Sequence, residues 1–164
     1  MVRKSRFSEK LMDKNEQTTR HVAWLLSLGG FLPFLFLAIT LLIIGNGSPL
    51  FELIFELFKI WSVIILAFIA GIRWGFAIAY PPFDLNSLLL SVIPAIMVMF
   101  SLLLPDIYTI FLLLLLYSAH GAWDSFFASS GKSPPWFGTI RMTLTFLVVA
   151  AHIIVAFAIS SSGS

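Results

Sequence analysis

The fold is decided by residues 67–80, which read AFIAGIRWGFAIAY. This segment is apolar enough to lie in lipid, yet it carries Arg73 in its second half. At about 100° per residue, a helix over this segment has two different faces. One face carries a small residue at every fourth position, namely Ala67, Gly71, Gly75 and Ala79, while Arg73 lies on the opposite face. Because small residues let another helix approach closely, we predict that this segment is the central helix of a small membrane bundle.

The composition of the whole chain is that of a membrane protein. Of its 164 residues, 59% are hydrophobic and 11% are charged, whereas a soluble domain has about 25% charged residues. The mean hydropathy is +0.99, and the length suits one bundle without a second domain. The sequence contains no cysteine, which excludes disulfides, zinc–thiolate sites and iron–sulfur clusters within it. It also has no basic groove motif for nucleic acid.

Five apolar segments predict five transmembrane helices, at about residues 22–44, 57–80, 88–104, 107–123 and 139–159. The predicted fold is therefore an all-α membrane protein, a bundle of five transmembrane helices in residues 21–160. Residues 1–20 and 161–164 are predicted to be polar tails. Before the second span, Glu52, Glu56 and Lys59 fall on one helical stripe, which predicts an amphipathic segment at the membrane interface. We find no internal repeat of the kind typical of inverted-repeat transporters.

The positive charges predict the orientation of the bundle. With five spans, the N-terminal tail and the loops after the second and fourth spans share one side of the membrane. Together with the helix halves nearest them, they hold nine of the ten Lys and Arg residues, Lys59 being the exception. The positive-inside rule places this side, and the N-terminus, in the cytoplasm and the C-terminus on the outer side. We expect the protein in the bacterial inner (plasma) membrane, or in the mitochondrial inner membrane if the source is eukaryotic.

In this orientation, polar and aromatic side chains gather in one layer of the inner leaflet. Arg73 precedes the end of its span by seven residues and lies about 10 Å above the inner interface, at about 1.5 Å per residue. An arginine at this depth costs a few kcal/mol unless it finds a partner, so we predict that Arg73 pairs with Asp124 or Asp84, with His120 nearby. A structural ion pair comes first among the interpretations, a ligand site second and catalysis third. The layer comprises Arg73, Trp74, Asp84, His120, Trp123, Asp124 and Arg141.

No catalytic or metal-binding pattern is present in the sequence. It lacks a Gly-rich phosphate loop, a His-Glu-x-x-His pattern and a Gly-x-Ser-x-Gly elbow. His120 and His152 have estimated depths that differ by only about 6 Å, but two histidines alone are a weak basis for axial haem ligation, and we predict no cofactor. His152, midway along the last span, is interpreted as a hydrogen-bonding core residue. A proton shuttle at His120 beside the aspartates keeps a membrane enzyme as a third alternative.

Several stretches resemble the domain-of-unknown-function family 3429, which includes an animal mitochondrial transmembrane protein and many proteobacterial proteins. FIAGIRWG at residues 68–75 is similar to the family signature Phe-Leu-Gly-Gly-x-Arg/His-Trp-Gly. LGGFLPF at residues 28–34, WFGTIRMTLT at residues 136–145 and the segment from Tyr117 to Asp124 also fit. Ala70, Phe137 and Ile140 depart from the pattern. The resemblance covers about residues 22–159 and implies a five-helix integral membrane protein of unestablished activity. It matches signature positions at Arg73, Trp74, Gly75, Asp124 and Arg141.

Two functions are expected from these observations. The first is a non-enzymatic membrane protein, an accessory, assembly or scaffolding component that works with other membrane proteins in the bilayer. The alternative is the binding or transport of a lipid headgroup, quinone or small anion at the polar layer. The small-residue face from Ala67 to Ala79 is expected to pack on a helix of the same chain, with a helix of another copy as the alternative.

Overall fold

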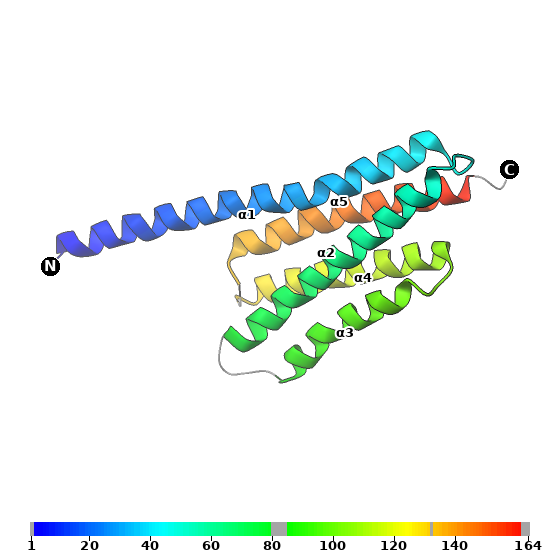
Figure 1. Ribbon diagram of the computed structural model, residues 1–164. Helices are drawn as coiled ribbons and strands as arrows, with labels where there is room; N and C mark the ends of the chain where they lie inside the picture. Colours follow the sequence, from blue (N-terminus) through cyan, green and yellow to red (C-terminus); the bar gives the residue numbers. More distant parts are fainter. Residues whose placement is uncertain (1, 80–84, 132, 162–164) are drawn as a thin grey trace.

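The computed structural model describes residues 2–79, 85–131 and 133–161, with side chains from residue 12 onward. These residues form five α-helices and no strand. The helices are α1 (Val2–Ile44), α2 (Phe51–Ala79), α3 (Leu85–Ser101), α4 (Asp106–Ser129) and α5 (Pro135–Ser160). They run alternately in opposite directions, so that α1 begins at one end of the bundle and α5 finishes at the other (Figure 1).

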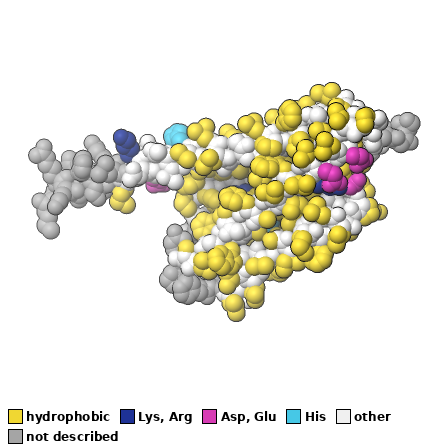
Figure 2. Space-filling model, in the orientation of Figure 1, with side chains coloured by type: hydrophobic (Ala, Val, Ile, Leu, Met, Phe, Trp, Pro, Cys, Tyr) yellow, Lys and Arg dark blue, Asp and Glu magenta, His cyan; other side chains and the backbone are white. Residues whose placement is uncertain are grey.

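Four of the helices are long and apolar enough to cross a membrane: α2, α4, α5 and the part of α1 from Met12 onward. The 17-residue α3 is apolar but shorter. Hydrophobic side chains cover most of the bundle surface, and charged side chains lie toward its two ends (Figure 2). Such a surface suits lipid, where only helices and closed barrels satisfy their own backbone hydrogen bonds. The prediction of an all-α fold is confirmed, and four of the five helices are long and apolar enough to cross a membrane.

Several helix ends differ from those predicted. The helix α1 starts at Val2, far before residue 22, because residues 2–20 contain no glycine or proline to stop it. The predicted interfacial segment is the first part of α2, and in it Lys59 is buried whereas Glu52 and Glu56 are exposed. The helix α5 begins at Pro135, since proline is tolerated in the first turn, where its missing N–H has no intrahelical acceptor.

The core lies where α1, α2, α4 and α5 meet around one histidine. His152 on α5 is fully buried, and its ring centroid lies 4.9 Å from Phe58, 5.2 Å from Tyr117 and 5.8 Å from Phe34. Its Nδ1 is 2.8 Å from the Val148 carbonyl oxygen, so it is a hydrogen-bonding core residue, as predicted. The Tyr117 hydroxyl donates to the Ser62 carbonyl at 2.8 Å, which ties α4 to α2.

The helices α4 and α5 pack most tightly at two glycines. A Cβ added to Gly138 would lie 2.7 Å from the Ala128 Cβ, and a Cβ added to Gly121 would overlap the Thr145 side chain. Contacts under 3.0 Å are not tolerated without movement, so both positions require glycine for this spacing. The two glycines lie one turn to either side of the point where Asp124 faces Arg141. They therefore set the distance between the helices at that pair.

The small-residue face of α2 does not have the partner expected for it. Ala67, Gly71 and Ala79 are exposed and Gly75 is half-buried. No atom of the described residues lies within 4 Å of a Cβ added to Gly71 or Gly75. The expectation that a helix of the same chain packs on this face is therefore wrong for the described residues. Arg73 on the opposite face faces the bundle instead, because its charge has a partner there.

Candidate functional site

The centre of the site is one carboxylate between two arginines. Asp124 on α4 lies with one oxygen 2.8 Å from Nε of Arg73 on α2 and with the other 2.5 Å from Nε of Arg141 on α5. All three side chains are at least nine-tenths buried. The Arg141 contact is a hydrogen bond, whereas the Arg73 N–H is not aligned for one and the contact is a charge pair. The three residues join three helices, and we call them the Arg–Asp–Arg cluster.

Aromatic rings cover the Arg73 side of the cluster. The Arg73 guanidinium carbon lies 4.9 Å from the centroid of Trp123 and 4.5 Å from that of Phe127, both on α4. The ring of Phe76 packs against Phe127 at 5.4 Å and against Phe137 on α5 at 5.6 Å. These cation–π and ring–ring contacts help to hold the guanidinium of Arg73 in its buried position. Phe127 was not predicted, although its spacing of four residues from Trp123 puts both on one face.

The cluster has more positive charge and more donors than the described residues use. Among the described residues, two guanidiniums face a single carboxylate, so one positive charge has no acidic partner there. Nη2 of Arg73 and both ring nitrogens of His120 are buried without a hydrogen-bond partner among the described residues. Buried polar atoms are nearly always satisfied in folded proteins. Unsatisfied donors beside an excess charge are typical of a site that a polar or anionic group completes.

The structure brings together most of the predicted layer. Arg73, Trp123, Asp124 and Arg141 are in contact, and His120 is buried one turn before Asp124. Trp74 is not part of the cluster, since it is 47% exposed on the outside of α2. Asp84 lies outside the described residues. Of the two partners predicted for Arg73, the structure shows Asp124.

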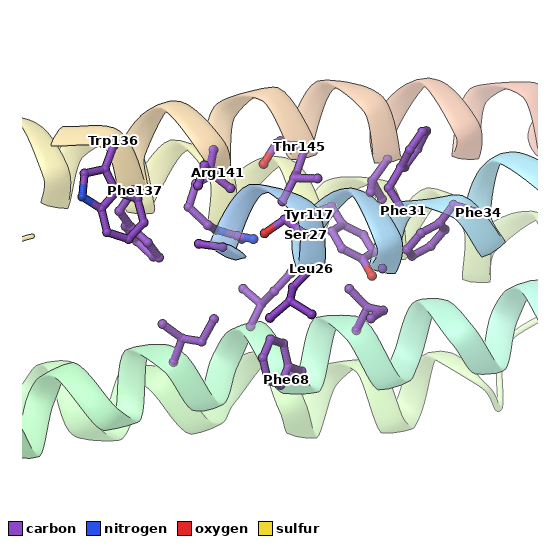
Figure 3. Close-up of a pocket in the computed structure, with 18 residues that line it drawn as sticks. Leu26, Ser27, Phe31, Phe34, Phe68, Tyr117, Trp136, Phe137, Arg141 and Thr145 are labelled. Carbon is purple, nitrogen blue, oxygen red and sulfur yellow. The ribbon is translucent and has the colours of Figure 1, made fainter. Parts of the chain in front are cut away.

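A cavity of about 380 Å³ adjoins Arg141 and was not predicted. It lies between α1, α2 and α5, with Tyr117 of α4 at its side. Along the cavity, Trp136, Phe137 and Arg141 line one end, Ser27 and Thr145 the middle, and Phe31 and Phe34 the other end (Figure 3). Nearly all other lining side chains are aliphatic, among them Ile65, Ile69, Ile72, Ile140, Leu144 and Val148.

The mouth of the cavity opens sideways, between α1 and α2. Leu26 on α1 is 72% exposed and Phe68 on α2 is 66% exposed, and both line the cavity (Figure 3). Beyond the mouth the two helices close on each other, since Trp61 Nε1 donates to the Gly30 carbonyl at 3.1 Å. Toward the start of α1 the helices diverge (Figure 1). The mouth therefore opens on the outer surface of the bundle, where many hydrophobic side chains are exposed.

A second charged cluster, at the opposite end of the bundle, was not predicted either. Lys59 on α2 pairs with Glu56 at 2.6 Å and with Asp106 at the start of α4 at 2.8 Å. Lys59 is buried, but the two carboxylates are about half exposed. The two carboxylates are therefore partly exposed at the end of the bundle. The ion pair of Lys59 with Asp106 links α2 to α4. Among the described residues, no group of three or more His, Asp or Glu could hold a metal ion.

Comparison with known proteins gives one family. The family model for "Protein of unknown function (DUF3429)" matches residues 19–157. No curated protein and no solved structure gives a significant match. The matched residues include the Arg–Asp–Arg cluster and all the residues that line the cavity.

Proposed function

This chain belongs to the DUF3429 family, and from that premise we propose that it is a non-enzymatic integral membrane protein that binds a membrane-soluble small molecule. The single observation that supports this proposal is the cavity, which is lined mostly by apolar side chains, has Arg141 at one end, and opens on the apolar outer surface of the bundle. Ligand sites are typically concave, mostly apolar and supplied with a few convergent polar groups. The cavity has the size and composition of such a site.

The binding function can be tested by filling the cavity. Ser27 lines the cavity from α1, whereas Leu25 is 70% exposed and does not line it. Ser27→Phe puts a ring into the cavity, and Leu25→Phe adds a ring of the same kind on the lipid-facing surface. In native mass spectrometry of protein released from mild detergent, we expect a retained small molecule on the wild type and on Leu25→Phe, and its loss from Ser27→Phe. Equal retention by both variants would count against binding in the cavity.

The orientation is part of the proposal, with five crossings, the N-terminus in the cytoplasm and the C-terminus outside. The charge distribution supports it, and the chain has no cysteine, so that single cysteines can report accessibility. Thr18 and Ser161 are exposed near the two ends of the helical bundle. A membrane-impermeant maleimide added to intact cells is expected to label Ser161→Cys and not Thr18→Cys until the membrane is permeabilised. The reverse pattern would invert the proposed topology.

An assembly or scaffolding role in the inner membrane is the second candidate. The exposed face of Ala67, Gly71, Gly75 and Ala79 favours it, because such faces mediate helix contacts in membranes. In native mass spectrometry, a second protein chain that is retained by the wild type and lost from Gly71→Leu would favour this role. A retained small molecule without a protein partner would favour the first.

A further inference from the structure

We propose that the cavity takes an amphiphile with a single alkyl chain and one negative charge, whose anionic group lies at Arg141. This inference rests on the proposed function, since it names the chemical class of the molecule that the same cavity would bind. The anionic group is a carboxylate or a phosphate, because both match the planar donor geometry of a guanidinium.

The charge of the ligand follows from the Arg–Asp–Arg cluster. Arg73 and Arg141 share Asp124 as their only acidic partner among the described residues, so one positive charge is left over in a buried place. A buried charge without a partner is costly in a membrane. One negative charge on the ligand compensates it, while a neutral or cationic ligand leaves it uncompensated.

The position of the anionic group follows from the distribution of polar side chains. Arg141 is the charged residue among those that line the cavity. Trp136 lines the same end, and its buried indole N–H has no partner among the described residues. At the other end, Phe31 and Phe34 offer only rings (Figure 3). The polar group of a bound molecule therefore lies toward Trp136 and Arg141, and its tail runs toward Phe34.

The number of chains follows from the cavity volume. A volume of 380 Å³ holds about a dozen groups of the ~30 Å³ that one water molecule takes in the liquid, and a methylene group is of similar size. One chain of about twelve carbons fills this space, so that the second chain of a phospholipid would have to lie outside it, beyond the mouth between Leu26 and Phe68. A free inorganic anion would leave the apolar part empty, and a quinone carries no charge to compensate the cluster.

The test compares three probes that share a dodecyl chain: dodecanoate, dodecanol and dodecyltrimethylammonium. Binding to the full-length protein in nonionic detergent is measured by native mass spectrometry from solutions at alkaline pH, where the carboxylic acid is ionised. We expect dodecanoate to bind at least about tenfold more tightly than dodecanol, since a charge-assisted hydrogen bond contributes at least this much. Dodecyltrimethylammonium is expected to bind more weakly than either.

Arg141→Gln removes the surplus charge and leaves Arg73 paired with Asp124, so the variant is expected to fold. In this variant, we expect the ratio of dodecanoate affinity to dodecanol affinity to fall to near one, while Arg141→Lys keeps most of the preference.

Equal binding of the two probes to the wild type, with both lost in Ser27→Phe, would overturn the charge inference and leave the proposed function standing. If no probe binds in a way that Ser27→Phe abolishes, the proposed function fails as well. Tighter binding of dioleoylphosphatidylglycerol than of dodecanoate would overturn the single-chain assignment.

Discussion

Asp124→Asn is expected to lower the free energy of unfolding by about 3–5 kcal/mol, the usual cost of leaving buried charges without their partner. The variant keeps the size of the side chain but removes the carboxylate that Arg73 and Arg141 share. Both guanidiniums then remain buried without the carboxylate that lies between them. Unfolding in mixed micelles with an increasing fraction of sodium dodecyl sulfate, followed by circular dichroism, measures this loss.

A second carboxylate provides the control for Asp124→Asn. Glu56 is also ion-paired, but its side chain is 52% exposed, and Lys59 keeps Asp106 as another partner. Glu56→Gln is therefore expected to cost at most about 1 kcal/mol, as is usual for exposed pairs. The loss of stability in Arg141→Gln should be smaller than that in Asp124→Asn, because Arg141→Gln leaves a neutral Arg73–Asp124 pair. If Asp124→Asn is no less stable than Glu56→Gln, the Arg–Asp–Arg cluster is not a buried charge network.

Gly138→Ala is expected to destabilise the protein by about 1–3 kcal/mol, the cost of overpacking a tight contact. The new methyl group would lie 2.7 Å from the Ala128 Cβ, which is attached directly to the backbone and cannot rotate away. The helices α4 and α5 must therefore separate, and the separation falls one turn from the pair of Asp124 and Arg141. We expect the preference for dodecanoate over dodecanol to decrease together with the stability.

The compensating change is Ala128→Gly, which removes the atom that the new methyl group meets. The double variant is expected to regain most of the stability lost in Gly138→Ala, less the roughly 1 kcal/mol cost of an extra glycine in a helix. Gly71→Ala adds the same methyl group where no atom of the described residues lies within 4 Å, so we expect no loss of stability from overpacking. If Gly71→Ala lowers the stability as much as Gly138→Ala does, the separation of α4 and α5 is not the cause of the destabilisation.

Much of the fold could be predicted from the sequence, because the bilayer requires long apolar helices and the chain has five apolar segments. Helix ends could be predicted less well. The polar residues before His21 continue α1, and they include no glycine or proline, the residues with the poorest helix propensity. The fifth span was predicted to begin at about residue 139, yet α5 begins at Pro135.

The pairing of Arg73 with Asp124 could be predicted because depth in the membrane limits the choice of partners. The contact of Asp124 with Arg141 depends on the distance between α4 and α5. Gly121 and Gly138 allow this short distance, and no local sequence pattern predicts it. The cavity could not be predicted either, since it arises where α1 and α2 diverge. Trp74 was assigned to the layer by depth alone, but its direction around the helix puts it outside.

The most direct test of the proposed site is an experimental density map of the protein in lipid nanodiscs with dodecanoate. We predict one elongated density in the cavity, with its carboxylate within hydrogen-bonding distance of Arg141 and its chain running between Phe31 and Phe34. A cavity closed by side chains, or a chain that lies with its carboxylate at the Phe34 end, would contradict the assignment of Arg141 as the anion-binding residue.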